Sequence, residues 1–201
     1  MALPSTGYTA SSAKNFVIDA GTIFTDVTYD STTQSFTGTP LGATNGGVGV
    51  NIAATYRKVE VDGTYIMDVV GLNLMSGMQC TITAKLKELT AANLRLAING
   101  VLETADTTEA PAGYKKITGK RYLQEGDYIP SIAIVGKLTG ATDPIVFMLD
   151  NGLVTSALDL QTEDQKEGEI EVTIQANANF DQLAANEFPW RIYHPDPVLT
   201  P

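Results

Sequence analysis

The chain has 201 residues, 43% of them apolar and 7% aromatic, and a formal net charge of −10. A chain of this length buries roughly 70% of its unfolded surface, so one domain with terminal arms can fold without a disulfide or a metal. The acidic charge excludes stable nucleic-acid binding, which requires basic side chains to neutralise phosphates, and the single cysteine, Cys80, excludes an internal disulfide.

The first part of the chain predicts an extended arm, two short strands and a long loop. Residues 1–13 are small and polar without periodicity, so we expect an N-terminal arm and no secretory signal peptide. Short strands are expected at 15–18 and 22–29. The glycines and proline of residues 37–49 interrupt any regular pattern, which predicts a long loop, and loops of this length are usually functional or disordered.

A long hairpin is predicted next. Alternating apolar residues from Val48 to Tyr56 indicate a half-buried strand, and the change of phase between Tyr56 and Val59 predicts a β-bulge or a strand that changes the sheet it faces. Asp62-Gly63 is typical of a two-residue turn, with a return strand over 65–74. Residues 78–86 alternate again, and Cys80 within them is expected to be a small buried side chain.

One short helix is predicted over residues 90–99. Thr90 is a suitable N-cap, an apolar stripe follows at Leu94, Ala97 and Ile98, and Asn99-Gly100 ends the helix. Residues 101–113 are expected to be loop.

The second half of the chain predicts a run of strands and a C-terminal arm. Strands are expected at 114–118, 129–138 and 145–149, the last a central strand because it is apolar on both faces. A second hairpin joins 153–161 to 169–177 across an acidic turn. The aromatic, proline-rich residues 188–201 predict an arm that cannot lie in a central strand and whose removal blocks assembly but not folding.

The inventory of catalytic side chains is small. His194 is the only histidine and lies in the predicted C-terminal arm, which excludes zinc sites built from histidine and cysteine and leaves no base for a nucleophilic serine or cysteine. Paired carboxylates among Asp150, Asp159, Glu169 and Glu171 suit glycoside hydrolysis, but equally suit a solvated face. We expect no enzymatic activity, no cofactor and no metal.

The charge is uneven along the chain. Residues 101–201 carry 16 acidic and 7 basic residues, a net charge of −9. The densest acidic cluster, residues 163–171, is open to three interpretations: a soluble hairpin tip, a calcium site without EF-hand spacing, or a surface that repels phosphates.

Two segments carry a resemblance to a known family. They are Tyr56-Arg57-Lys58-Val59-Glu60-Val61-Asp62-Gly63, and Lys87-Glu88-Leu89-Thr90 followed by Asn93-Leu94-Arg95. In the sequence of these segments and in the order of its strands, the chain resembles the tail tube (major tail) proteins of long-tailed, non-contractile bacteriophages. The resemblance implies a mainly β, sandwich- or barrel-like fold with one flanking helix. It also implies a virion protein made in the bacterial host cytoplasm, whose six-subunit rings stack into a tube that carries DNA from capsid to host.

The implied partners are the chain itself, other tail proteins and DNA in transient, sequence-independent passage, with no membrane. If each of six subunits gave about four strands, a barrel of ~24 strands spaced ~4.8 Å apart would have a diameter near ~37 Å, wide enough for duplex DNA. Candidate lumen-lining residues from the two hairpins are Asn51, Thr55, Asp159, Glu169, Glu171, Gln175 and Asn177. Candidate inter-subunit residues are Asn45, Gly46, Gly47, Phe188, Trp190, Ile192 and Tyr193.

Two other functions fit the same sequence. A monomeric β-sandwich binding module, such as a virion decoration or carbohydrate-binding domain, explains the strands and the acidity, but explains the apolar C-terminal arm and the long unpaired loop less well. The inner tube of a contractile tail or secretion system shares the tube fold.

Overall fold

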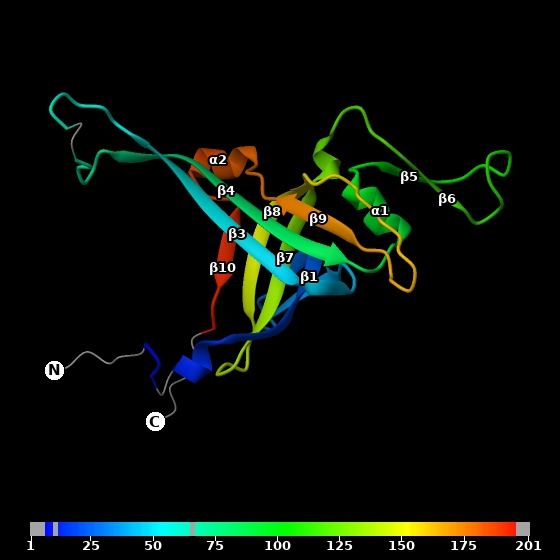
Figure 1. Cartoon of the computed structure of the whole chain (residues 1–201), viewed down its shortest axis with the longest axis horizontal. Coiled ribbons are helices and arrows are strands. Elements are labelled where there is room, and N and C mark those ends of the chain that lie inside the picture. The colour runs from blue at the N-terminus through cyan, green and yellow to red at the C-terminus, as the bar shows by residue number, and fades with distance from the viewer. Residues whose placement is uncertain (1–6, 10–11, 65–66, 196–201) are drawn as a thin grey trace.

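The computed structural model describes residues 7–9, 12–64 and 67–195, and these form a mainly β protein, as predicted (Figure 1). Its strands are β1 (Val17–Asp30), β2 (Ser35–Pro40), β3 (Thr44–Lys58), β4 (Asn73–Leu86), β5 (Val101–Thr104), β6 (Lys115–Thr118), β7 (Ile129–Leu138), β8 (Ile145–Val154), β9 (Ile170–Gln175) and β10 (Trp190–Tyr193). The helical elements are short: α1 (Ala91–Ala97), α2 (Phe180–Ala185), and 3₁₀ turns at Ser12–Asn15 and Glu125–Asp127. In this described part of the chain, no helix is long and apolar enough to cross a membrane.

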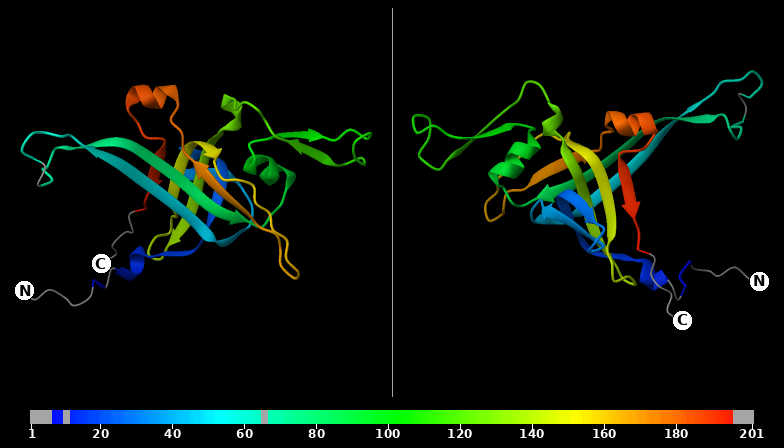
Figure 2. Two further views of the ribbon diagram at one scale, coloured as in Figure 1. Left: turned by 45° about the horizontal axis from the view of Figure 1, so that its top comes forward. Right: turned by 180° about the vertical axis from the view of Figure 1, so that it is seen from behind.

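A single antiparallel sheet folds over itself into two layers. Its order is β2-β1-β7-β8-β9-β4-β3, and β10 also pairs with β8. Strand β8 belongs to both layers, because residues 146–149 pair with β10 whereas Leu153 and Val154 pair with β9. Beyond it, β9, β4 and β3 cross over the layer formed by β1, β7 and β8, and the separate β5–β6 hairpin extends away from the body (Figure 2).

The core lies between the two layers. Alternate residues of each strand point inward, so Ile23, Ile132 and Leu149 from the first layer pack with Ile82 and Ile174 from the second, all essentially inaccessible to solvent. Burial of each such side chain contributes roughly 1.5–3 kcal/mol to folding. Cys80 is buried in this core, as predicted, and burial raises the pKa of its thiol to about 11.

Strand β8 is covered on both faces, as its sequence predicts. A second small cluster, formed by Val27, Ala133, Val146 and Met148, lies on the face of the first layer that points away from the main core. The β1–β2 hairpin folds over this outer face and covers the cluster with Phe24 and Phe36.

Helix α1 begins where the sequence predicts. The Thr90 hydroxyl accepts a hydrogen bond from the Asn93 backbone N–H at 3.1 Å, and the buried Asn93 amide donates to the carbonyls of Glu88 (2.8 Å) and Leu41 (3.2 Å). Asn99 takes a left-handed conformation (φ 48°) just beyond the helix and donates to the Val154 carbonyl at 2.8 Å. The cap therefore fixes the helix, and the two asparagines attach it to the sheet.

Replacing Thr90 with alanine is expected to destabilise the protein by ~1 kcal/mol, because the Asn93 N–H loses its acceptor at a partly buried helix start. Chemical denaturation of the two proteins measures the difference. Thr107→Ala, in the exposed β5–β6 connection, is the matched control and is expected to change stability by less than ~0.5 kcal/mol. Equal stability of T90A and T107A would contradict the role of the cap.

The predicted loop over residues 37–49 is wrong, since β2 extends to Pro40 and β3 begins at Thr44. The pairing of β3 with β4 shifts register between Asn45 and Val48. Gly46 and Gly47, which lie in this shift, have φ angles of 75° and 84°. These glycines therefore permit a bulge within β3, because residues with a side chain larger than hydrogen disfavour positive φ. They do not form a free loop.

The predicted first hairpin has the right turn but the wrong return strand. Thr64 N–H donates to the Val61 carbonyl at 3.1 Å around Asp62-Gly63. Of the return strand expected over 65–74, residues 65–66 lie outside the described residues and 67–72 form no strand, because β4 starts only at Asn73. It then continues through the separately predicted strand 78–86. The predicted change of phase corresponds to a bulge on the partner strand: Thr55 pairs with Gly77 and Tyr56 with Met75, so Ser76 is the extra residue.

Other elements differ in extent. The strands expected at 15–18 and 22–29 are one strand, β1, with a register shift between Ile18 and Thr22. The strand expected at 153–161 is wrong, because β8 ends at Val154 and only Leu160 forms an isolated bridge, to Ile170. Strand β5 and helix α2 form where no element was predicted.

The C-terminal segment is not a free arm over its described part. Residues 190–193 form β10 and pair with Val146–Leu149 of β8 in the same chain. The prolines at 189 and 195 lie just outside the four-residue strand, which explains why so short a strand forms at the edge of the layer. Residues 196–201, and residues 1–6 and 10–11 of the predicted N-terminal arm, lie outside the described residues.

Candidate functional site

The outer face of β3, β4 and β9 is a continuous polar surface. In antiparallel pairs, directly opposite residues share a face, and the ladder places Asn51 opposite Thr81, which lies opposite Gln175. The next row contains Gly49, Thr83 and Thr173. Gln79 donates from its amide to Gln175 across the strands at 3.2 Å. The middle of this face therefore consists of short, uncharged polar side chains.

Four of the predicted lumen residues lie on this polar face. Asn51 and Thr55 come from β3, and Glu171 and Gln175 come from β9. Glu171 is opposite Lys85 of β4, so its charge has a basic neighbour. The structure therefore brings these residues together on one face.

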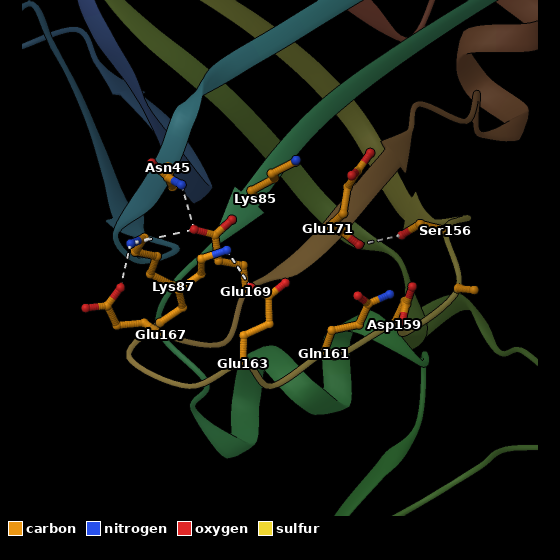
Figure 3. A pocket seen from close by; sticks show the side chains of 12 residues that line it. Asn45, Lys85, Lys87, Ser156, Asp159, Gln161, Glu163, Glu167, Glu169 and Glu171 are labelled. Carbon is orange, nitrogen blue, oxygen red and sulfur yellow. Dashed lines mark hydrogen bonds and ion pairs between the residues drawn. The ribbon is translucent and has the colours of Figure 1, made fainter.

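The acidic residues concentrate at one end of the face, around a pocket beneath the loop of residues 155–169 (Figure 3). The Glu169 carboxylate accepts a hydrogen bond from the Asn45 amide at 2.5 Å and lies 3.6 Å from the Lys87 ammonium. Lys87 also donates to Glu167 at 3.2 Å, and this hydrogen bond raises the pKa of Lys87. Asp159 lines the same pocket from the loop.

Lysines within the pocket balance part of its acidity. Lys85, Lys87 and Lys166 line the pocket together with its carboxylates. Among the described residues, no group of three or more histidine, cysteine, aspartate or glutamate side chains is arranged to hold a metal ion. The arrangement is that of a mixed-charge rim at one end of a neutral face.

Asn177 is separated from the other lumen candidates. Its amide donates to the Asn151 and Gln175 carbonyls, both at 3.0 Å, and the Asn151 amide donates back to the Asn177 carbonyl at 3.0 Å. These bonds fix the chain between β9 and α2. Asn177 therefore has a structural role between the layers and does not belong to the polar face.

The far end of the β3–β4 hairpin extends from the body as an apolar arm (Figure 1). Val70 is 100% exposed and Met67 is 72% exposed. Other large apolar side chains of the arm are also exposed: Tyr56, Val61, Val69, Leu74 and Met75. Sequence reasoning placed part of this segment in a return strand and so missed it, although the run Met67 to Leu74 without basic residues was visible.

Lys58 holds the loop at the tip of the arm. Its partly buried ammonium donates to the Asp68 carboxylate at 2.8 Å and to the Met67 carbonyl at 3.3 Å. This ion pair lowers the pKa of Asp68. The tip is thus organised from within by polar contacts while its apolar side chains face outward.

The predicted inter-subunit residues occupy two places. Asn45, Gly46 and Gly47 lie at the bulge of β3 next to the mixed-charge rim. Phe188, Trp190, Ile192 and Tyr193 lie in or beside β10.

Within their own chain, all three of these aromatic side chains already make intramolecular contacts. Trp190 packs against the main core and stacks on Phe188 with ring centroids 6.1 Å apart, and Tyr193 lies 5.2 Å from the Phe36 ring. Phe188, Ile192 and Tyr193 remain exposed. Only part of the predicted aromatic anchor is therefore available to a neighbour.

Comparison with known proteins gives little beyond this geometry. No family model matches the sequence, and no curated protein matches it. Among solved structures, a chain from the virion of a native gene transfer agent (GTA) particle is similar at a TM-score of 0.37 with 10% sequence identity; the match covers 87% of this chain and 95% of that one. Any assignment of function therefore depends on the polar face, the arm and the strand edges of this chain.

Proposed function

We propose that this chain is a structural virion protein, the subunit of a phage tail tube. Copies assemble into rings of six, the rings stack, and the polar face of β3, β4 and β9 lines a channel through which DNA passes. The proposal gives the chain no catalytic residue and no cofactor. Its partners are further copies of itself and the neighbouring tail proteins.

The observation that carries the proposal is the β3–β4 hairpin. Strand β3 has 15 residues, about 50 Å of extended chain, and in the described structure its outer edge pairs with no other strand. Long exposed strand edges cause aggregation unless another chain covers them. The same hairpin carries the apolar arm, and contiguous exposed apolar patches on soluble proteins mark interaction sites. Self-association through this hairpin satisfies both features.

The layout of the second layer suits a closed barrel. Strands β3, β4 and β9 and the end of β8 give about four strands per copy, so six copies give ~24 strands and a barrel near ~37 Å in diameter. Closure joins the β3 edge of one copy to the opposite edge of the next, as a heterologous contact around a ring. Side chains on the polar face then border a channel that admits duplex DNA.

The chemistry of the face suits passage rather than binding. Threonine, asparagine and glutamine in the middle offer no cationic partner for phosphates, and the mixed-charge rim, in which carboxylates outnumber lysines, repels them. The carboxylates of this face gather at one end of it. In a tube, that end would give each ring one acidic band.

A charge reversal on this face tests the lumen assignment. Glu171→Lys places a lysine opposite Lys85 in every copy, and we expect tubes of this variant to retain a short DNA duplex at low salt and to release it as salt rises. Sedimentation of tubes with labelled duplex measures retention. Glu103→Lys, an exposed change of equal charge on β5, is the control and should retain no more DNA than the unchanged protein. Equal retention by both variants would refute the assignment of this face to the lumen.

A further inference from the structure

Helix α2 presents its apolar side chains to solvent and its polar side chain to the protein. Phe180 is 91% exposed and Leu183 is 71% exposed, and their i, i+3 spacing places them on one face of the helix. Gln182, on the other side, is partly buried. A surface helix normally buries its apolar stripe, so this orientation is inverted.

Polar contacts hold the helix in this orientation. The Gln182 amide donates to the Asp150 carboxylate at 2.7 Å, and its oxygen accepts from the Asn179 N–H at 3.1 Å. Asn179 in turn caps the helix by accepting from the Gln182 N–H at 2.8 Å. Asp150 is buried, and its carboxylate also accepts two hydrogen bonds from Arg191, at 2.5 and 2.7 Å. The helix therefore gains its position from hydrogen bonds, and its apolar face is left unused within the chain.

An apolar groove lies further along the same outer face of the first layer. Its floor and walls include Phe24, Phe36, Val135, Pro144 and Val146, and its volume is about 330 Å³. Val146 and Asp150 point to the same side of β8, because they are an even number of residues apart. Helix α2 lies beside Asn151, whose amide faces the Gln182 side chain. Val146, in the groove, is five residues of extended strand away from Asn151, a distance of ~17 Å. The helix therefore cannot reach the groove of its own chain.

We propose that Phe180 and Leu183 of one copy dock into this groove of a second copy. This proposal rests on the tube function proposed above. It identifies a contact between two copies that are displaced from each other along the direction of β8. Such a head-to-tail contact does not close on itself between two copies, and it repeats along a stack.

The size of the contact explains why it acts only within an assembly. The two side chains and the groove bury roughly 600 Å² counted on both partners, against the ~1,200–2,000 Å² of a stable specific interface. Isolated monomers are therefore not expected to dimerise through it. Six such contacts between two rings act together and gain from effective concentration.

Disulfide cross-linking tests the contact directly. In the variant Leu183→Cys with Ser35→Cys, one cysteine lies on α2 and the other on the rim of the groove. A disulfide requires Cα atoms within about 7 Å, so a bond between these sites must join two chains. The natural Cys80 is buried, and burial raises its thiol pKa to about 11, so it does not compete.

Oxidised tubes of the double variant are expected to give a ladder of multimers on a non-reducing gel, whereas either single variant gives at most dimers. Leu183→Ser with Phe180→Ser is expected to leave rings intact but to shorten tubes at least tenfold. Thr37→Trp, which fills the groove, should do the same, and Thr39→Trp on the same strand outside the groove should not. Tubes of normal length with no ladder would overturn this contact while leaving the tube function standing. Absence of any ring or tube from the unchanged protein would instead refute the proposed function.

Discussion

Replacing Met67 and Val70 by aspartate is expected to abolish assembly of the protein into rings and tubes while leaving each copy folded. Both side chains project from the tip of the β3–β4 arm, and Val70 is fully exposed. Their removal therefore costs the monomer almost nothing, within about 0.5 kcal/mol. Buried in an interface, each charge would cost several kcal/mol, which is enough to prevent association.

Light scattering and electron microscopy measure the assembly, and thermal unfolding measures the fold. The matched control is Met67→Leu with Val70→Ile, which keeps the apolar character of the same two positions and is expected to assemble normally. Assembly of the aspartate variant at the concentration that suffices for the unchanged protein would show that the arm is not an interface.

Replacing Asp150 by alanine is expected to destabilise the fold by about 2 kcal/mol. The buried carboxylate joins three elements, since Arg191 of β10 and Gln182 of α2 both donate to it on β8. Removing one partner of a buried ion pair costs ~3–5 kcal/mol, and a lower value is expected here because the Arg191 side chain remains 50% exposed and can return to water. Urea denaturation measures the loss.

A double-mutant cycle isolates this contact. Asp150→Ala and Arg191→Ala should each be costly, and the double variant should cost less than their sum by roughly 1 kcal/mol or more. Glu163→Ala with Lys166→Ala is the control, because that ion pair is exposed on both sides and should show coupling below ~0.5 kcal/mol. Additive losses at Asp150 and Arg191 would contradict a joint role. The same contact predicts that truncation before residue 188 destabilises the protein, contrary to the expectation that removal of the arm leaves folding intact.

Sequence patterns predicted those strands and helices whose formation depends on residues that are close together in the sequence. Strict alternation located much of β3 and β4, the apolar run Ile145–Leu149 located a doubly covered strand, and Thr90 located the start of α1. In each case the side chains that set the pattern lie within a few residues of one another. Helix α2 had such a signal as well, in the spacing of Asn179 and Gln182, but its apolar residues suggested no buried face.

Long-range features were not available from these patterns. Gly46 and Gly47 look like a loop until β4 is placed beside them, and Trp190 to Tyr193 look like a free arm until Asp150 is found to hold Arg191. The same holds for the candidate surface: Asn51, Thr55, Glu171 and Gln175 were predicted together, whereas Asn177 was misplaced because its hydrogen bonds to Asn151 depend on tertiary packing. The apolar arm was missed because exposure, unlike hydropathy, is a property of the folded chain.

Electron microscopy of the purified protein over a range of concentrations, with light scattering alongside, tests the central claim most directly. The tube function predicts rings of six or stacked tubes, with a central channel roughly 27 Å wide after side chains of ~5 Å on each wall are allowed for. The aspartate variant of the arm, run in parallel, should show neither. A protein that remains monomeric at every concentration, with no rings in the images, would contradict self-assembly and favour a monomeric binding module in its place.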